Sequence, residues 1–123
     1  MRICCFSDIH GNLEALEIFF KQRNVKEAEI LIFIGDLVGY GASPNEVIEK
    51  IRDFNCIGVK GNHDYAVITG KTSWFNLQAA SAIKWTRNTL SKENMRFLED
   101  LPDRLCRSSL LLPGTFRWLV LSG

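Results

Sequence analysis

The stretch Lys60-Gly61-Asn62-His63-Asp64 decides the fold that this sequence predicts. It places an amide, an imidazole and a carboxylate on three consecutive positions, directly after the short apolar run of residues 56–59. In open α/β sheets, ligands bind outside the carboxyl ends of the strands. A polar cluster that begins where a buried strand ends is therefore typical of a ligand site.

Two earlier apolar runs end in the same way. Residues 2–7 are followed by Asp8 and His10, and residues 29–34 are followed by the pair Gly35-Asp36. Continuous apolar strands separated by helices indicate a parallel sheet with both faces covered and right-handed crossovers. The predicted fold class is therefore α/β, with a mainly parallel βαβαβ sheet. Its polar strand ends would meet at one edge, which predicts a single metal site.

Helices are expected between these strands. Asn12 can cap the first helix, and residues 24–28 are expected to form the connection to the second strand. The run Ser43-Pro44-Asn45-Glu46 is typical of a capping box with proline at the first helical position, and this helix should end near Asp53. The apolar face expected for the first helix carries Leu13, Leu16, Phe19 and Phe20.

The chain changes character after the third strand. Residues 65–74 are expected to be irregular, and a helix is predicted over residues 76–90. Ser91 can cap a further short helix that ends at Leu98. The apolar side expected for the helix over 76–90 carries Leu77, Ala80, Ile83 and Leu90.

Composition restricts the class of protein. With 123 residues, a single domain over residues 1–123 is the default, and 46% hydrophobic residues argue against disorder. The net charge of +1, without runs of like charge, does not indicate nucleic-acid binding. None of the four cysteines shows CxxC spacing, which favours thiols in a reduced interior. Because no apolar stretch has the length of a signal or of a membrane span of about 20 residues, a soluble cytoplasmic protein is expected.

The last twenty residues differ in composition from the rest. From Arg104 onward they contain three arginines but no lysine, acid or histidine. Residues 110–112 and 118–121 are apolar runs separated by Pro113-Gly114, and each could be a strand.

The side chains at the three strand ends are of metal-ligand type. Asp8 and His10 are two positions apart, so both can reach one centre from an extended turn. Asp36 and Asn62 each follow a glycine, which lets the backbone approach closely. Two carboxylates, an imidazole and an amide oxygen suit manganese, iron, zinc or nickel. An aspartate shared between two ions would let them lie about 3.5–4 Å apart, the spacing used for phosphoryl displacement.

Each of these residues also has a simpler interpretation. Asp8 and Asn12 could be helix caps, Asp36 a turn former, and His63 a surface histidine. For one residue taken alone the simpler interpretation is favoured. Their occurrence together at consecutive strand ends, beside glycines, favours a metal site.

These motifs resemble those of a known superfamily. Asp8-x-His10, Gly35-Asp36 and Gly61-Asn62-His63-Asp64 resemble the first three motifs of the calcineurin-like metallophosphoesterases. The run from Gly35 to Gly41 is similar to that of small bacterial and archaeal phosphoesterases, and the resemblance covers residues 1–102. It implies the N-terminal half of an αββα sandwich with two divalent metal ions. It also implies hydrolysis of a small phosphoester, a monoester or a diester, by metal-activated water.

The resemblance also implies a role for each site residue. Asp36 would bridge two metal ions, because it would be a ligand of both. His63 would lie outside the ligand shell and protonate the leaving alkoxide, and Asp64 would orient or tune it. The implied metal ligands are Asp8, His10 and Asp36 for the first ion, and Asp36 and Asn62 for the second.

The chain departs from the superfamily pattern in two respects. Gly39 and Tyr40 stand where the Ser/Thr protein phosphatase branch carries an aspartate and an arginine, which argues against that branch. The later motifs of the superfamily supply three more histidines, but this chain has two histidines in all, His10 and His63. The resemblance therefore implies a single metallophosphoesterase domain that looks truncated at its C-terminus.

Other interpretations follow from the missing histidines. The chain could be a metal-poor binding or scaffold protein on the same fold. Another subunit could instead complete the site, and an apolar sheet face left exposed would favour a homo-oligomer.

Overall fold

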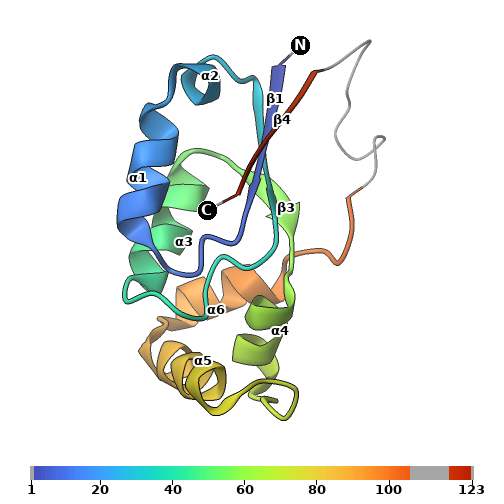
Figure 1. Cartoon of the computed structure of the whole chain (residues 1–123). Coiled ribbons are helices and arrows are strands. Elements are labelled where there is room, and N and C mark those ends of the chain that lie inside the picture. Colours follow the sequence, from blue (N-terminus) through green and yellow to red (C-terminus); the bar gives the residue numbers. More distant parts are fainter. Residues whose placement is uncertain (1, 106–116, 123) are drawn as a thin grey trace.

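The computed structural model describes residues 2–105 and 117–122, and Figure 1 shows their arrangement. The side chains of residues 117–122 are not part of that description. The elements are β1 (Arg2–Ser7), α1 (Leu13–Lys21), α2 (Arg23–Lys26), β2 (Ile30–Ile34), α3 (Pro44–Asp53), β3 (Ile57–Val59), α4 (Asn62–Thr69), α5 (Leu77–Thr89), α6 (Lys92–Glu99) and β4 (Arg117–Ser122).

The described strands form one parallel sheet in the order β3-β2-β1-β4. This order confirms the predicted α/β class and the parallel βαβαβ unit. Residues 118–121 lie within β4, as expected, and β4 pairs with β1 along its length. The strand expected over residues 110–112 lies outside the described residues.

The core explains why the strands are apolar on both faces. Helices α1, α2 and α3 cover one face of the sheet, and α4, α5 and α6 lie at the end where the strands finish (Figure 1). Phe6 and Phe33 point into the helical layer, and the Phe6 ring lies 4.6 Å from that of Phe19. Ile3 and Ile32 are buried on the opposite face.

Two of the three expected helix caps are confirmed. The Asn12 side chain accepts a hydrogen bond from the backbone N–H of Ala15, at 3.1 Å. The Ser91 hydroxyl accepts one from the backbone N–H of Asn94 at the start of α6. Each cap satisfies a donor that the first helical turn leaves unpaired.

The capping box expected at Ser43 is wrong. Proline occupies the first turn of α3 as predicted, but the Ser43 side chain makes no capping hydrogen bond. Asn45 instead connects α3 to the start of α6. Its amide donates to the Thr89 carbonyl at 3.0 Å, and its oxygen accepts from the Ser91 N–H at 2.9 Å. These bonds fix the position of α6 against α3.

Three expectations about local structure are also corrected. Residues 65–74 are not irregular throughout, because α4 extends to Thr69 and ends at Gly70, whose φ of 75° is left-handed. The connection expected over 24–28 overlaps the short helix α2, which begins one residue earlier. In α5 the side chain of Leu77 is 89% exposed. Leu77 lies about 200° around the helix from Ala79, which begins the buried stripe.

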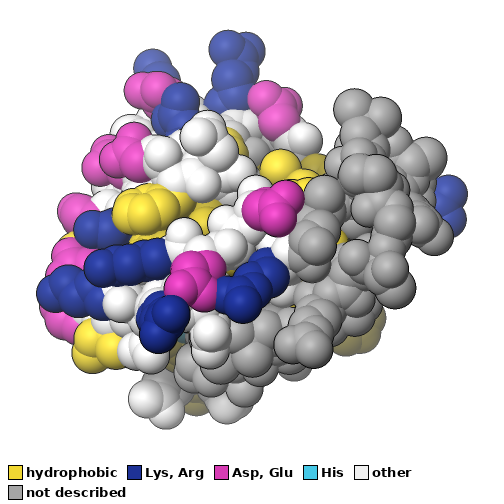
Figure 2. Space-filling view, turned by 90° about the horizontal axis from the view of Figure 1, so that it is seen from above, with side chains coloured by type: hydrophobic (Ala, Val, Ile, Leu, Met, Phe, Trp, Pro, Cys, Tyr) yellow, Lys and Arg dark blue, Asp and Glu magenta, His cyan; other side chains and the backbone are white. Residues whose placement is uncertain are grey.

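Charged side chains cover the end of the sheet where the strands begin. Seen from this end, basic and acidic groups intermingle on the described part of the surface (Figure 2). Glu27 pairs here with both Arg2 and Arg23. Among the described helices, none has the length and apolar character needed to cross a bilayer.

Candidate metal centre

The loops that follow β1 and β2 bring three metal-ligand side chains together. Ligand atoms of Asp8, His10 and Asp36 all lie within 4.8 Å of one another. Backbone hydrogen bonds join the two loops, from the His10 N–H to the Asp36 carbonyl at 2.9 Å and from the Gly11 N–H to the Leu37 carbonyl at 2.7 Å. The convergence expected from the two strand ends is present, and it is a geometry that one metal ion could occupy.

The backbone of all three residues is left-handed. Asp8, His10 and Asp36 have φ values of 58°, 52° and 57°. Residues other than glycine rarely adopt positive φ, and such conformations concentrate at functional sites because the surrounding structure must impose them. Here the imposed turns direct one imidazole and two carboxylates toward a common point.

His10 is oriented by the neighbouring loop. Its Nδ1 lies 3.3 Å from the Val38 carbonyl oxygen, so an Nδ1–H would donate to that carbonyl. Nε2, which lies 3.5 Å from Asp8 Oδ1, is then the atom free to bind a metal. Ligand histidines are commonly held by a second-nitrogen hydrogen bond of this kind.

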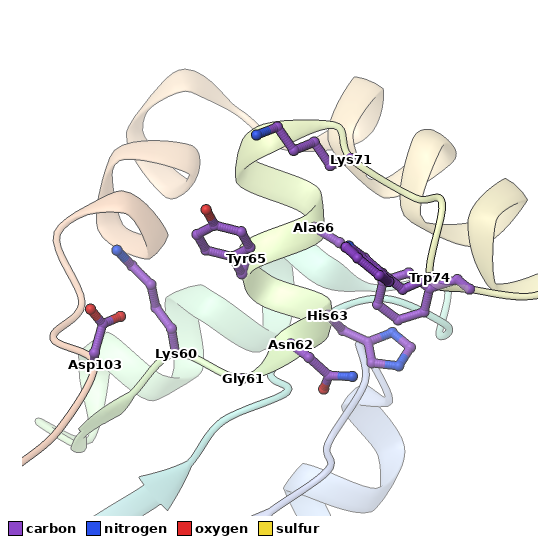
Figure 3. Close-up of a pocket in the computed structure, with 10 residues that line it drawn as sticks. Lys60, Gly61, Asn62, His63, Tyr65, Ala66, Lys71, Trp74 and Asp103 are labelled. Atoms are coloured by element: carbon purple, nitrogen blue, oxygen red, sulfur yellow. The ribbon is translucent and has the colours of Figure 1, made fainter.

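Asp36 lies against the start of α4. Its Oδ1 accepts a hydrogen bond from the backbone N–H of His63, at 2.9 Å. A Cβ at Gly61 would lie 2.2 Å from that same oxygen, so only glycine permits this approach. Asn62 follows at the first position of α4, with its side chain exposed at the helix start (Figure 3). The carboxylate and the amide thus come from the two neighbouring strand ends that the sequence indicated.

His63 is packed among aromatic rings. The imidazole lies 4.7 Å from His10, 4.9 Å from Tyr40 and 4.9 Å from Phe75, between ring centroids. Burial lowers the pKa of His63 below its ordinary value, and the nearby Asp36 carboxylate opposes that shift. A Cβ at Gly39 would lie 2.6 Å from His63 Nδ1, so the glycine makes room for the ring.

Asp64 is fully buried and binds three backbone N–H groups. It accepts hydrogen bonds from Asp36 at 2.8 Å, from Gly61 at 2.9 Å and from Val38 at 3.2 Å. Burial raises the pKa of Asp64 to about 6, although these N–H donors favour the carboxylate. The hydrogen bonds described for Asp64 go to the backbone and not to the His63 ring. Its position therefore supports a role in holding the Asp36 loop to α4.

Sequence reasoning missed several residues that surround His63. Tyr40 appeared only as a departure from a motif, yet its half-exposed ring contacts both histidines. Phe75 and Trp74 also line the space beside His63, but Trp74 ends the stretch expected to be irregular, and Phe75 lies between that stretch and the helix predicted over 76–90. The signal that could have pointed to them is the pair of adjacent aromatic residues shortly after the His63 motif.

The fold is that of a recognised class of protein. A model of the family described as calcineurin-like phosphoesterase matches residues 1–120, and the chain belongs to that family. The chain is 50% identical to the uncharacterized protein MJ0912 of Methanocaldococcus jannaschii over 105 residues, which cover 81% of this chain and 42% of that protein.

Solved structures show the same relationship. A metallophosphoesterase from Sphaerobacter thermophilus is 39% identical with a TM-score of 0.69, over 85% of this chain and 42% of its own. The hypothetical protein PH1004 from Pyrococcus horikoshii shares the fold, with a TM-score of 0.72 and 24% identity over 83% of this chain and 48% of its own. The chain thus spans less than half the length of these relatives.

Proposed function

We propose that this chain carries the metal-binding and proton-donating part of a site that hydrolyses phosphomonoesters or phosphodiesters. The observation that carries the proposal is the cluster of Asp8, His10 and Asp36, whose ligand atoms lie within 4.8 Å on three left-handed residues. Membership of the calcineurin-like phosphoesterase family supports it.

The residues of the site divide into two groups by their chemistry. Asp8, His10 and Asp36 would hold one divalent ion, and Asp36 with Asn62 would contribute to a second. A bound ion would supply positive charge next to the phosphoryl group and would acidify a water molecule. His63 would donate a proton to the leaving oxygen, and its packing against His10 keeps it close to the ligand cluster.

Asp64 would not react itself but would hold Asp36 and His63 in position. Its carboxylate joins the Asp36 loop to the start of α4 through three hydrogen bonds. That connection keeps the ligand Asp36 and the proton donor His63 in a fixed relation. Such supporting groups are needed because displacements of about 1 Å can cost about 100-fold in rate.

Calorimetry with manganese tests the metal site. We expect one ion to bind, and we expect Asp36→Ala to abolish binding, because Asp36 is the ligand that both ions would share. Asp53→Ala is the matched control, since Asp53 is an exposed acid at the end of α3. Equal binding by wild type and Asp36→Ala would remove Asp36 from the site.

A further inference from the structure

An open cleft of about 620 Å³ adjoins the candidate metal centre. Its lining includes Asn62 and His63 at the start of α4, and Lys71, Trp74 and Phe75 after the end of that helix (Figure 3). If His63 donates a proton to the leaving oxygen, the group attached to that oxygen must extend away from the metal ligands. The cleft is the space next to His63 that could receive it.

Aromatic side chains give the cleft its character. Trp74 is 88% exposed, although burying an indole is normally favourable. In Figure 3 the Trp74 indole and the His63 ring lie on the same side of α4. Tyr65, which is 54% exposed, is a second large ring on the lining. Exposed rings at a binding cleft offer flat surfaces on which a planar group can stack.

The segment that carries Trp74 is anchored on both sides. Gly70 closes α4 with a hydrogen bond from its N–H to the Ala66 carbonyl at 2.8 Å. The Phe75 N–H donates to the Thr72 carbonyl at 3.0 Å, and the Phe75 ring packs on His63. These contacts hold the segment against α4 while the indole of Trp74 stays exposed.

The charges in the cleft favour an anionic ligand. Lys60 and Lys71 both line it, against one acidic lining residue, Asp103. A group that combines a planar ring with negative charge matches this combination of indole and ammonium groups.

We propose that this cleft binds the leaving group of the phosphoester, and that this group is a nucleoside whose base stacks on Trp74. The proposal rests on the proposed function, because it names the substrate class for the same site. Trp74 would determine specificity without taking part in the reaction, and Lys71 would favour ligands with additional phosphate.

Equilibrium dialysis of the 123-residue chain with manganese tests the proposal with three probes: AMP, ribose 5-phosphate and adenosine. We expect AMP to bind about tenfold more tightly than ribose 5-phosphate, the difference expected for one base stacked on an aromatic side chain. Trp74→Ala should remove this preference. Trp85→Ala is the matched control, because Trp85 is also exposed, at 47%, but lies on α5 outside the lining.

The outcomes separate this inference from the proposed function. Equal binding of AMP and ribose 5-phosphate, or a preference that survives Trp74→Ala, would overturn the nucleoside assignment and leave the phosphoesterase proposal standing. Adenosine should bind weakly even without manganese, and Trp74→Ala should remove this binding. If adenosine behaves in this way but manganese does not raise the affinity for AMP or for ribose 5-phosphate, the phosphoesterase proposal fails while the nucleoside cleft stands. Failure of all three probes to bind would overturn both.

Discussion

The backbone of single residues determines what the ligand side chains can reach. Asp8, His10 and Asp36 owe their convergence to left-handed turns, which are enforced by hydrogen bonds between the loops after β1 and β2. Gly39 and Gly61 are required because they have no Cβ atom. A Cβ at Gly39 would clash with His63, and a Cβ at Gly61 would clash with Asp36. Residue types alone therefore do not make the site.

A substitution at Gly39 tests this steric requirement. In Gly39→Ala the new carbon would lie 2.6 Å from His63 Nδ1, on a residue whose φ is 130°. Gly70→Ala is the matched control, since its φ of 75° is also left-handed but its nearest contact, at 3.5 Å on Arg87, is ordinary. We expect Gly39→Ala to lower the free energy of unfolding by about 1–3 kcal/mol more than Gly70→Ala does. Urea denaturation gives the two values, and equal losses would show that the His63 ring moves aside freely.

The role proposed for His63 predicts a specific kinetic pattern. His63→Ala should lower turnover by about 100- to 10,000-fold, the range for a positioned acid–base group, with metal binding nearly unchanged. The loss should shrink for p-nitrophenyl esters, whose leaving group needs little protonation. Rate measurements belong in a chain extended with the later histidine motifs, where activity is expected to be highest. A variant that lost its manganese along with its rate would make His63 a metal ligand instead.

At the scale of elements, α4 is the point at which the sheet and the site meet. It begins directly after β3, and Asp64 at its third position accepts the Gly61 N–H as well as two N–H groups from the loop after β2. The first turn of α4 therefore holds together the ends of two strands.

Asp64→Asn should weaken this connection. The amide has one acceptor oxygen where the carboxylate has two, so at least one buried N–H would lose its partner, at a cost of about 2 kcal/mol. Manganese affinity should fall as well, because the Asp36 loop would no longer be fixed to α4. Chemical denaturation and calorimetry measure the two effects. Unchanged stability together with unchanged affinity would contradict a positioning role for Asp64.

The sequence predicted the regular parts of these elements better than their junctions. Strands β1, β2 and β3 were evident because each is a continuous apolar run, and Asn12 and Ser91 had recognisable capping positions. Helix α4 was missed because Gly61, its N-cap residue, offers no side-chain cap, and because Gly70 suggested a loop. The cap expected at Ser43 failed because Asn45 forms the connecting hydrogen bonds instead, and these depend on contacts between distant segments.

The same distinction applies to the site. The sequence could identify Asp8, His10 and Asp36 as candidate metal ligands, because each follows a strand and parallel strands end at one edge of the sheet. It could not give the left-handed backbone of these residues, nor the aromatic packing of His63. The exposure of Trp74 depends on the path of the segment after α4, and no local pattern encodes that path.

For the whole molecule, buried thiols make stability depend on pH. Cys4, Cys5 and Cys56 are buried and free of disulfides, and burial raises the pKa of Cys56 to about 12 from 9.0. The fold therefore favours the protonated thiol. The contribution of the protonated Cys56 thiol to the free energy of unfolding is fully present below pH 9. It is lost as the pH rises toward 12, because the thiol of the unfolded chain ionises at a lower pH than the buried thiol.

Denaturation midpoints at pH 8 and pH 10.5 test this effect. The wild type should lose more stability over this interval than Cys56→Ala, which lacks the titrating thiol. An equal pH dependence of wild type and Cys56→Ala would show that the Cys56 thiol ionises as easily in the fold as in the unfolded chain.

A thiol reagent tests the burial of the same thiols. In a Cys106→Ser background, the native chain should resist the reagent at pH 8 and react fully once unfolded.

For the chain as a whole, the number of histidines leads to a prediction about phosphoesterase activity. Beyond His10 and His63, these 123 residues offer no further imidazole, so a second ion would have mainly Asp36 and Asn62. We expect the chain to hydrolyse bis(p-nitrophenyl) phosphate poorly with excess manganese, and a chain extended by the later histidine motifs to be far more active. Equal rates would point either to ligands from a partner chain or to a mechanism without a second ion. Activity restored on mixing inactive variants, one altered at Asp36 and one elsewhere in the site, would indicate the partner chain.

The most direct test of the metal centre is to locate manganese by its paramagnetic broadening of backbone amide resonances. Substoichiometric Mn²⁺ should broaden the signals of Asp8, His10, Asp36 and His63 first, and should leave Asp53 sharp. In Asp36→Ala this selective broadening should disappear. Broadening centred on another group of acids, or spread evenly over the chain, would contradict a metal centre at the ends of β1 and β2.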